Sequence, residues 1–448
     1  RNYIVKAVKL PNDPDYSKLW GLPKINAPAA WDRNTGSKTI IVAVSDTGVD
    51  VNHPDLAGNI WVNTGEVPGN GIDDDGNGYI DDVNGYDFFD KDGDPADTHG
   101  HGTHVSGTIG GVGNNGKGVV GVTWNVKIQA LRFLGPNGGS SWDGAQTILY
   151  AAKNGARIVN ASWGGGGPTS YLRDAINTLG AAGGLFIAAA GNNNVNTDAT
   201  PHYPSSYDVP AVVSVAASTH SDNRAYFSNY GKVSVDLAAP GYQIYSTMPG
   251  NKYGSMSGTS MAAPHVAGAC ALALSLAPSL DGPTLKAKLL STVKPVQLFS
   301  AITSSGGRLD VEALLAAASD AAGPPAVQGV TMKAGVRSDA EVSWTALTES
   351  DLAAYRVRWG GAPGSYSNEV VVDKSQTKAT ITDLTHGKTY YVVVQGIDQA
   401  KNDGKLSAEV SVTAVDQTPP PQVLDLKATP VLGDVLRGTL VSASGEFS

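Results

Sequence analysis

This sequence has almost no cysteine and no excess of basic residues, and each of these shortages excludes classes of function. The 448 residues include a single cysteine, Cys270. One cysteine cannot supply an intrachain disulfide framework, a thiolate zinc site or an iron–sulfur cluster. Basic residues number 32 against 41 acidic ones, giving a net charge of −9, and they form no stripe along the chain. We therefore expect no nucleic-acid partner and no attraction to anionic membranes.

Long hydrophobic runs are also missing. The nearest candidate, residues 261–278, contains His265 and two prolines and is built mostly from small residues, so we expect a buried helix and no membrane span. The chain as a whole is 41 % hydrophobic and only 16 % charged, which excludes an intrinsically disordered protein.

The length of the chain predicts two or three domains. Between about residues 37 and 275, short apolar runs alternate with amphipathic stretches. The apolar runs predict buried strands at 39–45, 127–131, 156–161 and 185–190. The amphipathic stretches predict helices at 104–110, 144–154 and 170–182. This alternation predicts a three-layer α/β domain with a mainly parallel sheet, and functional residues near the carboxyl ends of its strands.

The pattern changes near residue 322, at a linker rich in proline and glycine. Beyond it, short β-rich runs at 341–344, 354–359, 369–372, 378–381 and 389–397 predict an all-β sandwich over residues 324–416. Tyr391 is the candidate for a tyrosine-corner hydroxyl there. A second proline-rich hinge begins a linker and tail, residues 417–448, to which we assign no function.

Three residues carry the strongest chemical signals. Ser260, in GTSMAAPH, begins a helix of small residues, where its backbone N–H could form half of an oxyanion hole; a simple helix cap is the alternative. Asp46 follows a buried strand and could orient an imidazole, or cap a turn. His101 lies in HGHGTH, which could be a polar loop or a metal site but lacks the HExxH spacing of zinc proteases.

Together, DTG at 46–48, HGTH at 101–104 and GTSMA with its proline at 258–264 resemble the subtilisin-like serine proteases, or subtilases. The resemblance spans about residues 10–320 and is strongest to the thermitase-like branch. It implies a subtilisin-like catalytic domain in which Ser260 is the nucleophile and His101 the general base and then acid. Asp46 would orient that imidazole, and Asn192 would donate to the oxyanion beside the Ser260 N–H.

The same resemblance implies a set of substrate-binding residues. Two extended segments would pair with the peptide backbone, which favours extended substrates and broad specificity. Trp142 would cover a distal subsite. His202 would lie at the base of the primary pocket, where it could narrow the pocket or favour polar side chains, or it could turn away. The full set is Gly138, Gly139, Ser140, Trp142, Ser162, Trp163, Gly164, Ala190, Gly191 and His202.

Calcium is the expected cofactor. In GNGIDDDGNGYIDD (69–82), side-chain oxygens at Asp73, Asp75 and Asn77 and a backbone carbonyl at Tyr79 follow the first half of an EF-hand loop. The twelfth position is not a glutamate, so Asp81 or Asp82 would have to complete the coordination; a solvated acidic loop is the alternative. The family resemblance implies a second calcium site, at Asp13, Asp55 and Asn115.

Two further segments resemble known elements. Residues 1–9 resemble the end of a subtilase propeptide, which would act as inhibitor and folding aid. Residues 324–416 resemble a fibronectin type III domain. We therefore expect a secreted, extracellular, calcium-stabilised serine endopeptidase that is a monomer and cleaves proteins and peptides through an acyl-enzyme. The alternative is an inactive scaffold whose second domain binds; an intact set of four catalytic positions argues against it.

Overall fold

The computed structural model describes residues 9–319, 323–349, 351–398, 402–416, 425–431 and 435–441. The chain divides into two compact units, Arg1–Ala321 and Ala322–Ser448, and each is described by itself. Apart from Lys9, the segment expected to be a propeptide remnant lies outside the described residues.

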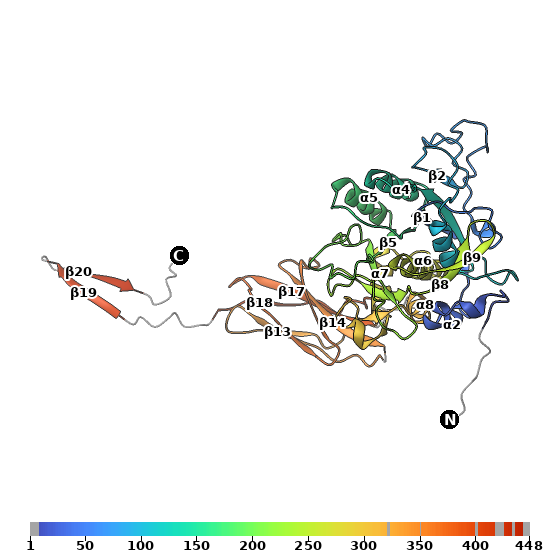
Figure 1. The fold of residues 1–448 in the computed structure, drawn as a ribbon. Coiled ribbons are helices and arrows are strands. Elements are labelled where there is room, and N and C mark those ends of the chain that lie inside the picture. Colours follow the sequence, from blue (N-terminus) through green and yellow to red (C-terminus); the bar gives the residue numbers. More distant parts are fainter. Residues whose placement is uncertain are drawn as a thin grey trace, which may run out of the picture. The chain divides into compact units, whose positions relative to one another are not determined.

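The first unit is built on a nine-stranded sheet (Figure 1). Its spatial order is β10 (Lys294–Pro295), β11 (Gly307–Arg308), β7 (Leu237–Pro240), β6 (Val212–Ser218), β5 (Leu185–Ala189), β4 (Ile158–Ala161), β1 (Gly36–Asp46), β3 (Asn125–Arg132) and β2 (Gly85–Asp87). All neighbours pair in parallel except β10 with β11. The central strands are buried on both faces because helices cover both, as their continuous apolar sequence predicts.

Helices form the two outer layers and confirm the predicted three-layer α/β fold. The helices α4 (Ser141–Lys153) and α5 (Ser170–Ala181) share one apolar core with one face of the sheet. The helices α3 (His101–Gly110), α6 (Thr259–Leu276) and α8 (Val311–Ser319) share another core with the opposite face. Among the described residues, α6 alone is long and apolar enough to cross a membrane, and 83 % of it is buried inside the protein. It is the central core helix of this unit.

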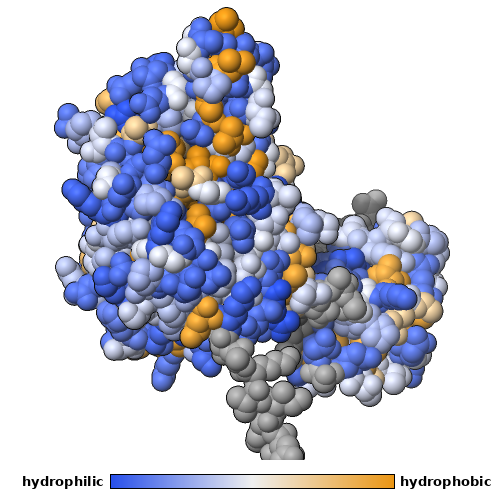
Figure 2. Space-filling model, turned by 90° about the vertical axis from the view of Figure 1, so that its right-hand side faces the viewer, coloured by the Kyte–Doolittle hydropathy of each residue, from blue (hydrophilic) through white to orange (hydrophobic). Residues whose placement is uncertain are grey.

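Smaller elements surround this framework. Their bounds are η1 (Tyr16–Lys18), α1 (Gly21–Lys24), α2 (Ala27–Trp31), η2 (Ala57–Asn59), β8 (Ile244–Met248), β9 (Lys252–Met256), α7 (Gly282–Ser291) and η3 (Gln297–Phe299). The segment between η2 and β2 projects from the unit at the top of Figure 1. The face of this unit drawn in Figure 2 is mainly hydrophilic, with hydrophobic residues gathered in a band below the projecting part.

In the described part of the second unit, the two larger antiparallel sheets confirm the predicted all-β sandwich. One has the order β12 (Thr331–Ala334), β13 (Ala340–Ser343), β16 (Lys378–Ile381); the other has β15 (Asn368–Asp373), β14 (Leu352–Gly360), β17 (Thr389–Asp398), β18 (Val410–Thr413). Trp344 and Tyr355 pack against each other in its core at a tilt, with ring centroids 5.2 Å apart. The strands β19 (Asp425–Val431) and β20 (Val435–Val441) form a third, two-stranded sheet in the segment predicted to be a linker and tail.

The tyrosine-corner prediction was wrong by one residue. Tyr390, not Tyr391, is buried, and its hydroxyl accepts a hydrogen bond from the Thr385 N–H at 3.1 Å. Side chains alternate between the two faces of a strand, so a tyrosine pair places one ring in the core and the other outward. The sequence alone did not distinguish which one turns inward.

Candidate active site and metal sites

The carboxyl edge of the parallel sheet brings the candidate catalytic residues together. Asp46 is the last residue of β1, Ser162 follows β4 and Asn192 follows β5. Ser45 pairs with Ala161 across β1 and β4, so these strands end at the same level. His101 is the first residue of α3, and Ser260 lies in the first turn of α6.

Asp46 and His101 form the polar centre of this edge. The His101 Nδ1 donates to Asp46 Oδ1 over 2.7 Å, and the carboxylate is fully buried. The Thr47 N–H also donates to Asp46 Oδ1, at 2.8 Å, which fixes the carboxylate plane. Burial lowers the pKa of His101, but the charge and hydrogen bond of Asp46 and the charge of Asp97 outweigh it, so that the pKa is raised above its usual 6.5.

Asp97, which the sequence analysis did not single out, is a second buried carboxylate beside this pair. It ties together the two segments that carry Asp46 and His101. Its oxygens accept from the Thr47 hydroxyl at 2.9 Å and from the Thr103 hydroxyl at 2.6 Å, and from the backbone N–H groups of His99, Gly100 and Thr103. The only sequence signal for it is an acid four residues before His101.

Two hydrogen-bond donors converge near Gly258. The Ser260 N–H lies in the first turn of α6, where backbone N–H groups have no acceptor within the helix. The Asn192 Oδ1 accepts from the Thr259 N–H at 2.8 Å and from the Thr259 hydroxyl at 3.0 Å, which fixes the side-chain amide. A Cβ added at Gly258 would lie 3.5 Å from both Asn192 Nδ2 and Ser260 N. Glycine there leaves room between the two donors.

The Ser260 hydroxyl forms no hydrogen bond with His101 in this structure. It donates instead to the carbonyl of Ser162, at 3.0 Å. The Ser162 hydroxyl in turn donates to the carbonyl of Ser260, at 2.8 Å.

The two predicted substrate-binding segments flank this centre. Gly138 closes a tight turn with Gly135, and Ser140 caps α4 by accepting from the Asp143 N–H at 3.0 Å. Trp142 is 54 % exposed and packs edge-on against Tyr171, so it is free to cover an apolar side chain. On the other segment, Trp163 packs against Phe133 and Phe186, while Gly164 is exposed.

His202 is wedged between the glycines of two strand ends. A Cβ at Gly164 would lie 2.2 Å from His202 Cε1, and one at Gly191 would lie 2.9 Å from His202 Nε2. The Ser205 hydroxyl lies 3.2 Å from Nδ1 on the opposite edge of the ring. Burial lowers the pKa of His202. The ring therefore lies against the backbone at both Gly164 and Gly191.

The acidic loop gathers three carboxylates, one of which the sequence analysis missed. Oxygens of Glu66, Asp73 and Asp75 lie within 4.8 Å of one another. Neither Asp81 nor Asp82 belongs to this cluster. Asp81 accepts from the backbone N–H groups of residues 69–71, and Asp82 accepts from Tyr150, Asn63 and Asn77.

The closely spaced carboxylate oxygens of this loop are ligands that suit calcium. The cluster supplies carboxylates from Glu66, Asp73 and Asp75, and Asn77 lies beside them, its N–H donating to Asp73 and to Asp75 at 2.9 Å. Three carboxylates held this close repel one another without a cation, and hard oxygen ligands are those that calcium prefers. The residues present therefore fit a calcium ion.

The other predicted metal residues also lie together. Asp13 accepts from the backbone of Asn114 and Asn115, and Asp55 accepts from the Asn115 side chain at 2.9 Å. Both carboxylates are buried, and in the described part of the chain neither forms an ion pair with lysine or arginine. Burial, aided by the charge of Asp55, raises the pKa of Asp13. Two adjacent buried carboxylates without a basic partner fit a divalent cation.

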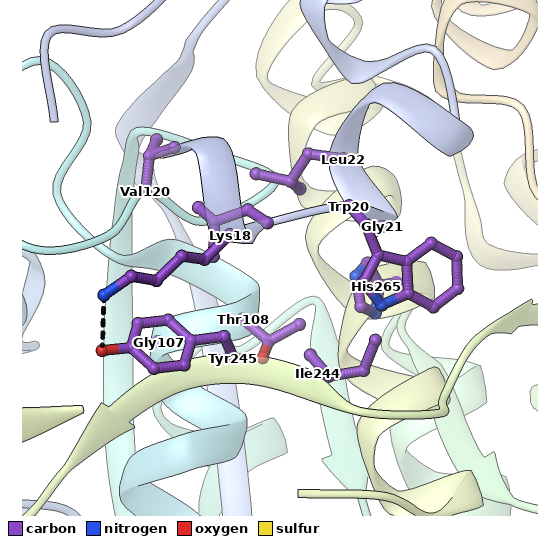
Figure 3. Close-up of a pocket in the computed structure, with 11 residues that line it drawn as sticks. Lys18, Trp20, Gly21, Leu22, Gly107, Thr108, Val120, Ile244, Tyr245 and His265 are labelled. Carbon is purple, nitrogen blue, oxygen red and sulfur yellow. Dashed lines mark hydrogen bonds between the residues drawn. The ribbon is translucent and has the colours of Figure 1, made fainter. Parts of the chain in front are cut away.

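A separate pocket is lined by residues of the N-terminal segment, α3, β8 and α6 (Figure 3). Lys18, Trp20 and Gly21 line it from the N-terminal segment, Tyr245 from β8 and His265 from α6. The Lys18 ammonium donates to the Tyr245 hydroxyl at 3.4 Å. None of the candidate catalytic, substrate-binding or metal residues lines this pocket, so it is not the active site.

Comparison with known proteins identifies relatives of each unit. The pattern of the subtilase family matches residues 37–329, and that of the fibronectin type III domain matches residues 325–413. Thermitase from Thermoactinomyces vulgaris is 42 % identical over 264 residues, covering 58 % of this chain and 84 % of thermitase. Subtilisin Savinase from Lederbergia lenta is 36 % identical over 274 residues, covering 61 % of this chain and 90 % of its own.

A solved structure is also similar to this chain. A protease from Pseudoalteromonas arctica superposes with a TM-score of 0.58 and 33 % sequence identity, covering 69 % of this chain and all of that one. The sequence relatives and the structural one therefore agree on the fold of the first unit.

Proposed function

The chain belongs to the subtilase family and is a serine endopeptidase, and on this premise we propose that Ser260, His101, Asp46 and Asn192 carry its catalysis. The observation that carries the proposal is the hydrogen bond between His101 and the buried Asp46, with Ser260 placed at the same edge of the sheet. A hydroxyl is a weak nucleophile until a neighbouring base takes its proton.

In this mechanism, the Ser260 hydroxyl turns from the Ser162 carbonyl to His101. Ser260 Oγ then bonds to the scissile carbonyl carbon while its proton passes to His101 Nε2. The oxyanion accepts from the Ser260 N–H and the Asn192 amide. Collapse breaks the carbon–nitrogen bond, and His101 returns the proton to the leaving amine. Water then repeats the sequence on the acyl-enzyme, with His101 again as base.

We also propose two calcium sites, one at Glu66, Asp73, Asp75 and Asn77 and one at Asp13, Asp55 and Asn115. Bound calcium would neutralise the carboxylates and so stabilise the fold. Millimolar calcium is typical of extracellular fluid, which supports secretion and action outside the cell. Broad specificity for extended peptides follows from recognition by backbone pairing along residues 138–140 and 162–164. A propeptide as inhibitor and folding aid belongs to the same proposal.

Labelling with a fluorophosphonate tests the proposal. One equivalent should attach to Ser260, as located by intact mass and peptide mapping, and none to Ser260→Ala. Ser257→Ala is the matched control, because this exposed serine precedes the same helix and should leave labelling unchanged. A folded, calcium-loaded protein that takes no label would favour the scaffold alternative.

A further inference from the structure

The nucleophile residue has a backbone carbonyl that its own helix cannot satisfy. In an α-helix the carbonyl of residue 260 accepts from the N–H of residue 264. Residue 264 is a proline inside α6, and proline has no N–H. The Ser260 carbonyl therefore lacks its regular donor, although it lies at the centre of the active site.

Ser162 supplies the missing donor. Its hydroxyl donates to the Ser260 carbonyl at 2.8 Å. Ser162 is only 3 % exposed, so water has little access to replace it. Behind it, the fully buried Asn160 donates from Nδ2 to the Ser162 hydroxyl at 2.9 Å, which leaves the Ser162 proton directed at Ser260. The result is a chain of hydrogen bonds from β4 to the first turn of α6.

We propose that Ser162 and Asn160 are positioning residues that hold the backbone of Ser260 in place of the helix hydrogen bond removed by Pro264. This inference rests on the proposed role of Ser260 and assigns the Ser162 side chain a task separate from substrate pairing by its backbone. Anchoring the Ser260 backbone fixes where its N–H points and the axis about which its hydroxyl rotates. Both matter in the transition state more than in substrate binding.

The expected kinetic signature separates positioning from binding. Ser162→Ala keeps the backbone carbonyl and should lower kcat about 10-fold, with KM within about 2-fold of the parent enzyme. Asn160→Ala should lower kcat in the same direction and cause no further loss in the Ser162→Ala background, because it acts through Ser162. Ser106→Ala is a matched control: this buried hydroxyl donates to the Gly102 carbonyl in α3, where the helix supplies a regular donor.

Restoring the helix donor gives the decisive test. Pro264→Ala introduces an N–H at residue 264, so Ser162→Ala should lower kcat less than 2-fold in that background, against about 10-fold in the parent. Thermal unfolding and far-ultraviolet circular dichroism check that each variant is folded. An equal loss of kcat in both backgrounds, or a loss confined to KM, would overturn the inference.

Fluorophosphonate labelling of the parent enzyme distinguishes a failure of the proposed function from a failure of the positioning role of Ser162. If the parent takes no label, the proposed function fails. If the parent takes label and Ser162→Ala is labelled at the same rate with unchanged kcat, the function stands and the positioning role is overturned.

Discussion

The Asp46 carboxylate, fully buried at the end of β1, accepts a 2.7 Å hydrogen bond from His101 Nδ1 at the start of α3. In the proposed mechanism, the donor at Nδ1 leaves Nε2 of the neutral ring to act as the base. Asp46→Asn retains the shape but can stabilise the wrong tautomer and cannot stabilise the imidazolium, so kcat should fall about 10,000-fold.

Steady-state hydrolysis of a peptide anilide measures this loss. Asp50→Asn is the control, because Asp50 lies in the same segment but bonds backbone N–H groups at residues 52 and 250. A loss in kcat of less than 10-fold for Asp46→Asn would contradict the assigned role.

Asp97 should set the acid limit of activity. The rate requires neutral His101, so kcat/KM falls as the pH drops through the pKa of His101. The charge of Asp97 helps to raise that pKa. Asp97→Asn should therefore move the acid limb of the profile to lower pH. The exposed Asp94, whose carboxylate accepts from the Ala96 N–H, supplies the control Asp94→Asn, whose acid limb should stay in place. An acid limb that moves upward or not at all in Asp97→Asn would refute this role.

Calcium removal should act on stability before chemistry. Chelation should lower the unfolding temperature by about 5 to 10 °C, as expected for loss of ligands bound well above their dissociation constants. Glu66→Gln should reduce the calcium-dependent part of that shift, measured by calorimetry with and without chelator. Asp74 lies in the same loop but outside the carboxylate cluster, so Asp74→Asn should retain the calcium-dependent shift in unfolding temperature. Equal shifts in both variants would show that Glu66 is not a ligand.

His202 should restrict the primary pocket. Its ring occupies the space between Gly164 and Gly191, so His202→Ala should open it. The ratio of kcat/KM for phenylalanine over alanine at the cleaved position should rise about 10- to 100-fold. His220→Ala, which removes an exposed imidazole that packs against Trp20, is the control. An unchanged ratio in His202→Ala would mean that the ring does not face the substrate.

Strands were easier to predict from the sequence than helix starts or distant contacts. The strands β1, β3 and β5 were predicted to within a few residues because buried parallel strands are uninterrupted apolar runs. The helices α3 and α4 begin three residues earlier than expected, since a glycine-rich turn and the Ser140 cap carry little periodicity. The strands β6 and β7 were not predicted.

For the candidate site as well, local motifs could be predicted from the sequence, whereas contacts between distant residues could not. The motifs located Asp46, His101 and Ser260, whereas Glu66 lies outside the pattern of an EF-hand-like loop and folds back onto it. The Ser162 hydroxyl could be assigned to Ser260 only from the hydrogen bonds of the folded chain, because 98 residues separate the two.

Two buried neutral histidines should limit stability in acid. His104 Nε2 donates to the Ile244 carbonyl at 2.9 Å and His265 Nδ1 to the Met261 carbonyl at 2.8 Å. Burial lowers the pKa of each to about 4. Because the unfolded chain takes up these protons near pH 6.5, stability should fall between pH 6.5 and 4, by up to about 3 kcal/mol for each histidine. Burial raises the pKa of Asp13 and of Asp236, which opposes this trend.

Comparison between variants isolates the histidine contribution, since the carboxylates are common to all of them. His104→Gln keeps a side-chain donor but cannot titrate, so its loss of unfolding free energy between pH 7 and 4.5 should be smaller than that of the parent. The exposed His220→Gln should lose as much as the parent. Urea unfolding of the Ser260→Ala background, which prevents self-digestion, measures both differences. Equal losses in all three proteins would show that His104 has the same pKa in the folded and the unfolded chain, so that burial does not lower it.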